Sequence, residues 1–206
     1  SRTIPIVKHT LEPLVYRGPA EGWDEADWQL KSPAELLELK VCDMAMGSGA
    51  FLVQVVEYLS DRLLEAWDAV MRANPDLPAI TPEGTPSQGS PNETIIPRDD
   101  ETERKILAKR LVADRCIYGV DKNPLAVEMG KLSLWLTTLS KGRAFTFLDH
   151  ALKCGDSLVG VSMEQLRYWK LQPERDRDGK IIDAEQMVGR FLQPVIDYAI
   201  DKRRQL

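Results

Sequence analysis

The alternation of apolar and polar residues predicts helices separated by short buried strands. After Gly49, apolar residues recur at steps of three and four, which is the spacing of one helical face. Short apolar runs at residues 40–44 and 115–121 are typical of buried strands. The helical face comprises Leu52, Val55, Val56, Leu59, Leu63, Trp67 and Val70, and we expect it to face the core.

The same pattern predicts further elements on both sides of this helix. Residues 1–16 are β-prone at their start and then favour a short helix. A third strand is predicted at 152–154, and Pro124 suits the first turn of another helix. The apolar positions of that helix are Leu125, Met129, Leu132, Leu136 and Leu139. Helical patterns also cover 35–39, 102–113 and, after a turn at 172–182, 184–204.

One long stretch has a different composition. Residues 71–101 are rich in proline and contain few large apolar side chains. Such a segment buries too little apolar surface to offset the entropy of ordering, so we expect a disordered or mobile loop there.

The order of strands and helices predicts an α/β fold. Strands separated by helical segments favour a parallel sheet with helices packed against it. The 206 residues suffice for one domain with a core and are too few for two large ones.

Composition narrows the class of protein. Hydrophobic residues make up 43% of the chain and charged residues 29%, with a net charge of −5. This acidic balance argues against a surface that coats nucleic acid. There is no long apolar run and no signal-peptide pattern, so we expect a cytoplasmic protein without membrane contact. The three cysteines are far apart, and we expect reduced core thiols and no metal site.

The candidate chemistry centres on the stretch VCDMAMGSGAFL, residues 41–52. A strand ends in Asp43, and the glycines that follow it lead into a helix. Glycines let a ligand approach the backbone, and ligands of parallel sheets bind beyond the carboxyl ends of the strands. No GK[ST] follows, which excludes a phosphate loop. Leu52 stands where a dinucleotide fingerprint has its third Gly or Ala, which disfavours a nicotinamide enzyme.

Acidic residues follow all three predicted strands. Asp43 ends the first strand, Asp121 the second, and Asp156 follows the third. A carboxylate at the end of the second strand can accept hydrogen bonds from both hydroxyls of a ribose. Asp156 could accept a hydrogen bond from an adenine amino group. The sequence therefore predicts a nucleoside-shaped site at one edge of the sheet.

Three segments resemble motifs of a known family. DMAMGSGAFL, IYGVDKNPLAVEMGKLSLWL and FLDHALKCGDSLVG are similar to the first three motifs of adenine-specific DNA methyltransferases of the large restriction–modification type. HTLEPLVY, near the start, resembles the helix that precedes the first motif. The resemblance covers roughly residues 4–165, and the second motif is the most specific.

The resemblance implies that residues 1–206 form a partial Rossmann-like methyltransferase domain, its cofactor-binding part, which binds S-adenosylmethionine. Asp121 would take the ribose hydroxyls, with Asn123 and Pro124 opening the next helix. Asp156 would face the adenine amino group, with Ser157 and Leu158 beside the ring. The methionine and sugar would be surrounded by Asp43, Ala45, Gly47, Ser48, Gly49 and Phe51.

The chain also departs from the family pattern. Met44 stands where the family usually has Pro, and Met46 where it usually has Cys. The family's catalytic [N/D/S]-P-P-[Y/F] motif is absent, because Asn74-Pro75 and Asn123-Pro124 are not followed by a second proline and an aromatic residue. We therefore expect no catalytic residue and no turnover from this chain alone. DNA contacts would come from other parts of a longer polypeptide.

Two other classes remain open at this point. One is a Rossmann-like binding or scaffold module without catalysis, and the other is a methyltransferase that acts on RNA, protein or a small molecule. An open sheet edge would also allow such a partial domain to dimerise.

Overall fold

The computed structural model describes residues 3–76, 79–87, 93–138 and 148–159. The chain forms two compact units, Ser1–Ser157 and Leu158–Leu206. All elements described below belong to the first unit. The predicted turn at 172–182 and helix at 184–204 lie outside the described residues.

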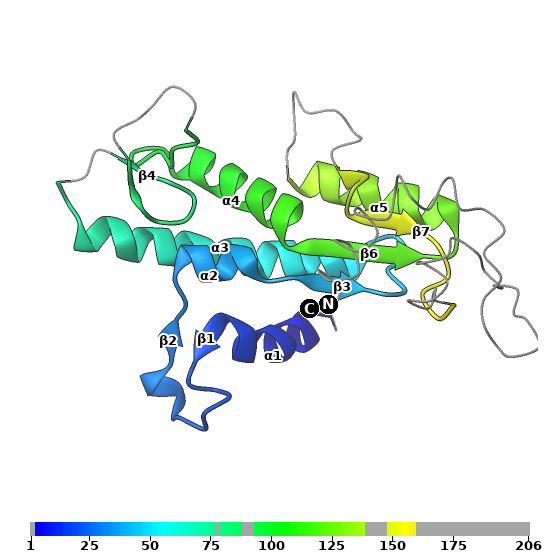
Figure 1. Ribbon diagram of the computed structural model, residues 1–206, viewed down its shortest axis with the longest axis horizontal. Coiled ribbons are helices and arrows are strands. Elements are labelled where there is room, and N and C mark those ends of the chain that lie inside the picture. Colours follow the sequence, from blue (N-terminus) through cyan, green and yellow to red (C-terminus); the bar gives the residue numbers. More distant parts are fainter. Residues whose placement is uncertain (1–2, 77–78, 88–92, 139–147, 160–206) are drawn as a thin grey trace, which may run out of the picture. The chain divides into compact units, whose positions relative to one another are not determined.

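Helices and short strands alternate along the first unit (Figure 1). In chain order they are α1 (Thr3–Val15), β1 (Tyr16–Arg17), η1 (Glu25–Asp27), β2 (Gln29–Leu30), α2 (Pro33–Glu38), β3 (Val41–Asp43), α3 (Ala50–Ala73), β4 (Ala79–Ile80), β5 (Pro86–Ser87), α4 (Glu101–Arg115), β6 (Ile117–Asp121), α5 (Pro124–Thr137) and β7 (Leu152–Cys154).

The central sheet is parallel, in the order β3-β6-β7. Asp43 is opposite Gly119, and Asp121 is opposite Cys154. The three strands run in the same direction, so their carboxyl ends meet at one edge, as expected from the sequence. The sheet and its helices are compatible with a Rossmann-like fold.

The two faces of this sheet differ in burial. Ile117 and Leu152 are buried on one face, beside α3 and α5. On the other face Cys42 and Lys153 are exposed, although parallel sheets are usually covered on both sides. The expectation of three core cysteines is therefore wrong for Cys42 and also for Cys154, which is exposed too.

Cys116 does belong to the core. Its Sγ donates to the carbonyl of Leu36 over 3.6 Å, and burial raises the pKa of its thiol to about 11. A thiol in this environment stays protonated and behaves as a small apolar side chain.

Helix α3 is the centre of the core. It packs against α1, α2, α4 and α5, and its expected apolar face is buried from Leu52 to Trp67. Of that face, Val70 is only partly buried. The sequence pattern therefore identified both the helix and most of its buried face.

The first residues form a helix and no strand. Helix α1 runs from Thr3 to Val15 with Val7, Leu11 and Val15 buried against the core. The β-prone interpretation of this start is wrong because the four-residue spacing of its buried side chains outweighs local strand propensity.

The described parts of residues 71–101 are more ordered than expected. Strands β4 and β5 pair antiparallel, and Ile80 forms a bridge with Ile96. Both isoleucines are fully buried, and Trp67 Nε1 donates to the Pro82 carbonyl over 2.8 Å. The expectation that this stretch buries little is therefore wrong for these residues.

Helix α5 packs through a face other than its leucine-rich one. Val127, Gly130 and Leu134 are buried, whereas four of the apolar positions recognised in the sequence are exposed and the fifth, Leu139, lies outside the described residues. The exposed residues are Leu125, Met129, Leu132 and Leu136.

Candidate functional site

The site begins with the turn between β3 and α3. Gly47 and Gly49 adopt positive φ angles of 54° and 78°, which residues with a Cβ rarely adopt. A Cβ at Gly49 would also lie 3.1 Å from Cα of Gly130 in α5. The glycines therefore bring the start of α3 close to α5 while keeping the turn at the sheet edge.

Asp121, at the end of β6, joins this turn to the next helix. Its carboxylate accepts N–H hydrogen bonds from Asn123 and Gly47, each over 2.8 Å. These two bonds, the one from Asn123 first, lower the pKa of the Asp121 carboxyl from its usual value of 3.8. The carboxylate predicted to bind a ribose is thus held ionised beside the glycine turn.

Asn123 and Pro124 begin α5 in the way the sequence indicates. The Asn123 side chain accepts a hydrogen bond from the N–H of Leu125 over 3.0 Å, and Pro124 occupies the first helical turn. This cap fixes the backbone directly after Asp121.

The loop after β7 reaches the same edge. Asp156 forms an ion pair with Lys122 over 3.1 Å, and the Ser157 hydroxyl donates to the Met44 carbonyl over 2.7 Å. The Gly155 N–H donates to the Asp121 carbonyl over 3.0 Å. Polar contacts therefore connect all three strand ends.

The Met46 side chain packs beside Gly119 of β6. It is buried, and a Cβ on Gly119 would collide with its Sδ. Because Gly119 has no side chain, it leaves the space that Met46 fills. Met46 itself stands where the resembled family usually has Cys. This pairing and the Lys122–Asp156 ion pair were not foreseen. The position of Lys122 directly after Asp121 is the signal in the sequence that could have indicated this ion pair.

The remaining predicted residues have different surroundings. Asp43 accepts a hydrogen bond from the Ala45 N–H over 3.0 Å, which shapes its own turn. Ser48 is exposed, whereas Phe51 packs partly against the core. Leu158 is 92% exposed and belongs to the second compact unit.

Two glycines at this edge have open space where a side chain would lie. A Cβ at Gly47 or Gly155 would meet no atom within 4 Å. The backbone beside the Asp121 carboxylate is therefore open at these two positions.

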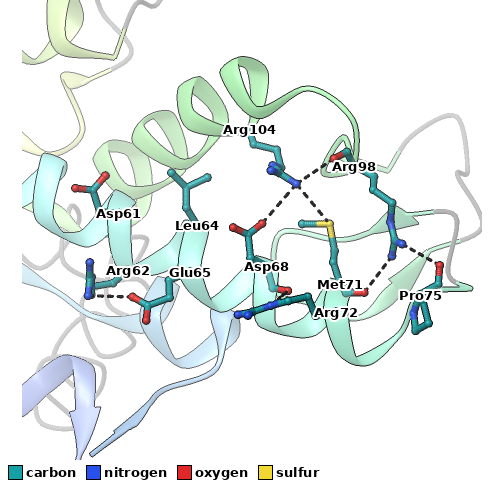
Figure 2. Close-up of a pocket in the computed structure, with 10 residues that line it drawn as sticks. All are labelled: Asp61, Arg62, Leu64, Glu65, Asp68, Met71, Arg72, Pro75, Arg98 and Arg104. Atoms are coloured by element: carbon teal, nitrogen blue, oxygen red, sulfur yellow. Dashed lines mark hydrogen bonds and ion pairs between the residues drawn. The ribbon is translucent and has the colours of Figure 1, made fainter. Parts of the chain in front are cut away.

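A groove lies far along α3, away from the strand ends. This groove of about 860 Å³ contains several charged side chains (Figure 2). Arg98 donates to the carbonyls of Asn74 and Pro75, and Arg104 pairs with Asp68 over 3.5 Å. These arginines hold the hairpin and α4 onto α3, so we interpret the groove as structural. Its lining comprises Asp61, Arg62, Leu64, Glu65, Asp68, Met71, Arg72, Pro75, Arg98 and Arg104.

Within the described ranges, no helix is both long and apolar enough to cross a bilayer. No family model and no solved structure matches the chain. The mixed α/β fold, with its parallel sheet and strand-end acids, is compatible with a Rossmann-like protein.

Similarity to one known protein supports a methyltransferase among the Rossmann-like proteins. Over 154 residues, covering 69% of this chain, the sequence is 27% identical to the type II restriction enzyme and methyltransferase RM.Eco57I of Escherichia coli. The chain spans 14% of the length of that protein. This partial similarity supports a relationship to a methyltransferase of a restriction–modification system.

Proposed function

We propose that this chain binds S-adenosylmethionine and forms the cofactor-binding part of a DNA adenine N6-methyltransferase of a restriction–modification system. The observation that carries the proposal is the hydrogen bond between Asp121 and the Gly47 N–H. It joins the ends of two adjacent parallel strands, where ligands of such sheets bind. The similarity to a restriction enzyme and methyltransferase supports the same assignment.

Each strand end has its own role in this proposal. The Asp121 carboxylate accepts the ribose hydroxyls, because an ionised carboxylate has more acceptor sites than its two backbone bonds use. The first turn of α3 offers N–H groups to the methionine part. Asp156 and Ser157 lie on the adenine side, with Lys122 orienting Asp156 through their ion pair.

The bound cofactor supplies an activated methyl group on its sulfonium. The residues of this chain bind and orient that cofactor, and such positioning is a main contribution of the protein to a transfer of this kind. The adenine to be methylated needs a polar and an aromatic side chain that hold it outside the duplex. No [N/D/S]-P-P-[Y/F] sequence occurs in this chain, so another segment would supply these groups and the DNA contacts.

Calorimetric titration of S-adenosylmethionine tests the proposal. The matched variants are Asp121→Asn and Asp76→Asn, the same chemical change at the sheet edge and at an exposed position beyond α3. We expect saturable binding that Asp121→Asn weakens about tenfold or more, because a charged acceptor is lost. Asp76→Asn should leave the affinity unchanged.

Two results would contradict the proposal. One is no binding by a chain that circular dichroism shows to be folded. The other is equal affinity of the wild type and both variants, since binding would then not involve the strand-end carboxylate.

A further inference from the structure

The loop after β7 reaches across the sheet to the loop after β3. The Ser157 hydroxyl donates to the Met44 carbonyl over 2.7 Å. In the strand order β3-β6-β7 these two loops follow the outer strands, and β6 lies between them. Neighbouring strands are about 4.8 Å apart, so the outer strands are about 10 Å apart. Residues 155–157, which we call the strap, therefore cross the end of β6 to make this contact (Figure 1).

The crossing lies beside the candidate cofactor site. Asp121 is the last residue of β6, and its register partner in β7 is Cys154, directly before the strap. From the side of β3, the Gly47 N–H donates to the Asp121 carboxylate over 2.8 Å. The glycine turn and the strap therefore approach Asp121 from its two neighbouring strands.

The strap is fixed at its start and more exposed beyond it. The Gly155 N–H donates to the Asp121 carbonyl over 3.0 Å and continues the pairing of β6 with β7. Further on, Asp156 pairs with Lys122, whose side chain is 82% exposed, and Ser157 is exposed too. Water competes for both partners of such contacts. They can therefore break and form again while the start of the strap stays in place.

We propose that the Ser157–Met44 hydrogen bond is a latch that closes the strap over bound S-adenosylmethionine. This inference rests on the proposed function, which places the ribose at Asp121 and the adenine beside Asp156. When the latch is closed, Asp156 is held on the adenine side and the cofactor is retained. When it is open, the cofactor enters and leaves. Ser157 is thus a positioning residue, because its hydroxyl bonds to the protein and acts through the strap.

The latch predicts a kinetic effect that a merely structural hydrogen bond would not have. We expect Ser157→Ala to raise the dissociation rate constant of S-adenosylmethionine about fivefold or more, because a bond that retains the cofactor is lost. The association rate constant should not fall. Ser157→Thr keeps a hydroxyl and should restore the wild-type dissociation rate constant.

Ser133→Ala is the matched control for removing a serine hydroxyl. The Ser133 hydroxyl also donates to a backbone carbonyl, that of Met129, over 2.8 Å within α5. Its loss should leave both rate constants unchanged.

Surface plasmon resonance with the immobilised chain measures both rate constants for the wild type and the three variants. An unchanged dissociation rate constant in Ser157→Ala, or an equal rise in Ser157→Thr or Ser133→Ala, would overturn the latch. The proposed function would stand in these cases, because the wild type binds the cofactor. No binding by the wild type would contradict the proposed function itself, and the latch with it.

Discussion

Helix α3 begins at the glycine turn and ends 24 residues later beside the groove of Figure 2, and the chain surrounds its two ends differently. At its end, Arg98 and the Asn74 side chain bind carbonyls of the last turn. At its start the cap is Gly49, and no described side chain caps it. Asp121 reaches instead to the turn before it.

The C-terminal end of α3 is thus stabilised by side chains, whereas its N-terminal end is suited to binding. Helix ends leave backbone groups without intrahelical partners, and these are satisfied by side chains, water or ligands. The Arg98 and Asn74 side chains satisfy carbonyls at the end of α3. Among the described residues no side chain caps the N–H end, whose neighbours are backbone glycines and the Asp121 carboxylate, and such an end suits a ligand with acceptors of its own.

The largest effect is expected where α3 meets the hairpin. Trp67→Ala removes a fully buried indole that bonds to Pro82, and we expect a loss of about 3–5 kcal/mol in the free energy of unfolding. Trp23→Ala, at a position that is 45% exposed, should cost much less. Urea unfolding followed by circular dichroism measures both, and equal losses would mean that the hairpin does not cover Trp67.

At the other end, Gly49→Ala should destabilise the chain by about 2–3 kcal/mol. The positive φ accounts for about 1–2 kcal/mol, and the approach to Gly130 adds to it. Gly22→Ala is the control for backbone strain alone, because its φ is 75° but no atom lies within 4 Å of the added Cβ. Thermal unfolding measures both variants. Equal decreases in melting temperature for Gly49→Ala and Gly22→Ala would rule out the close contact between α3 and α5.

Arg98→Ala should cost about 1–2 kcal/mol, since it removes hydrogen bonds to the carbonyls of Met71, Asn74 and Pro75. Arg72→Ala removes only a bond within its own helix, to the Asp68 carbonyl, and should cost less than about 0.5 kcal/mol. Urea midpoints compare the two. A larger loss from Arg72→Ala would show that Arg98 does not brace the helix end.

The smallest expected effect is on the melting temperature at acidic pH. Because the folded pKa of Asp121 lies below 3.8, its contribution to stability is present above that pH and is lost as the pH falls through the folded pKa. We expect the melting temperature of the wild type to fall more steeply below pH 3.8 than that of Asp121→Asn. If the melting temperatures of the wild type and Asp121→Asn fell in parallel down to pH 2, the carboxylate would not be held by Gly47 and Asn123.

Much of the sheet edge could be predicted from the sequence. Short apolar runs ending in Asp43 and Asp121 locate strand ends, and the glycines locate the turn. The exposed side of α5 could not be predicted, because a four-three spacing of leucines fits a core face and an interface equally. Gly130 decides between them, since only a face without a side chain there can approach Gly49.

The hairpin was missed for a similar reason. Prolines dominate residues 71–101 and favour a loop interpretation, whereas the order depends on two isoleucines far apart in sequence. Pairing between Ile80 and Ile96 is non-local, and local composition does not reveal it.

Hydrogen exchange with and without S-adenosylmethionine tests the central claim most directly, because it reports both ends of α3 in one experiment. The account predicts slower exchange in peptides covering residues 44–52 and 119–125, with no change at residues 68–76. Protection at 68–76 with the sheet edge unchanged, or no protection anywhere under saturating cofactor, would contradict it.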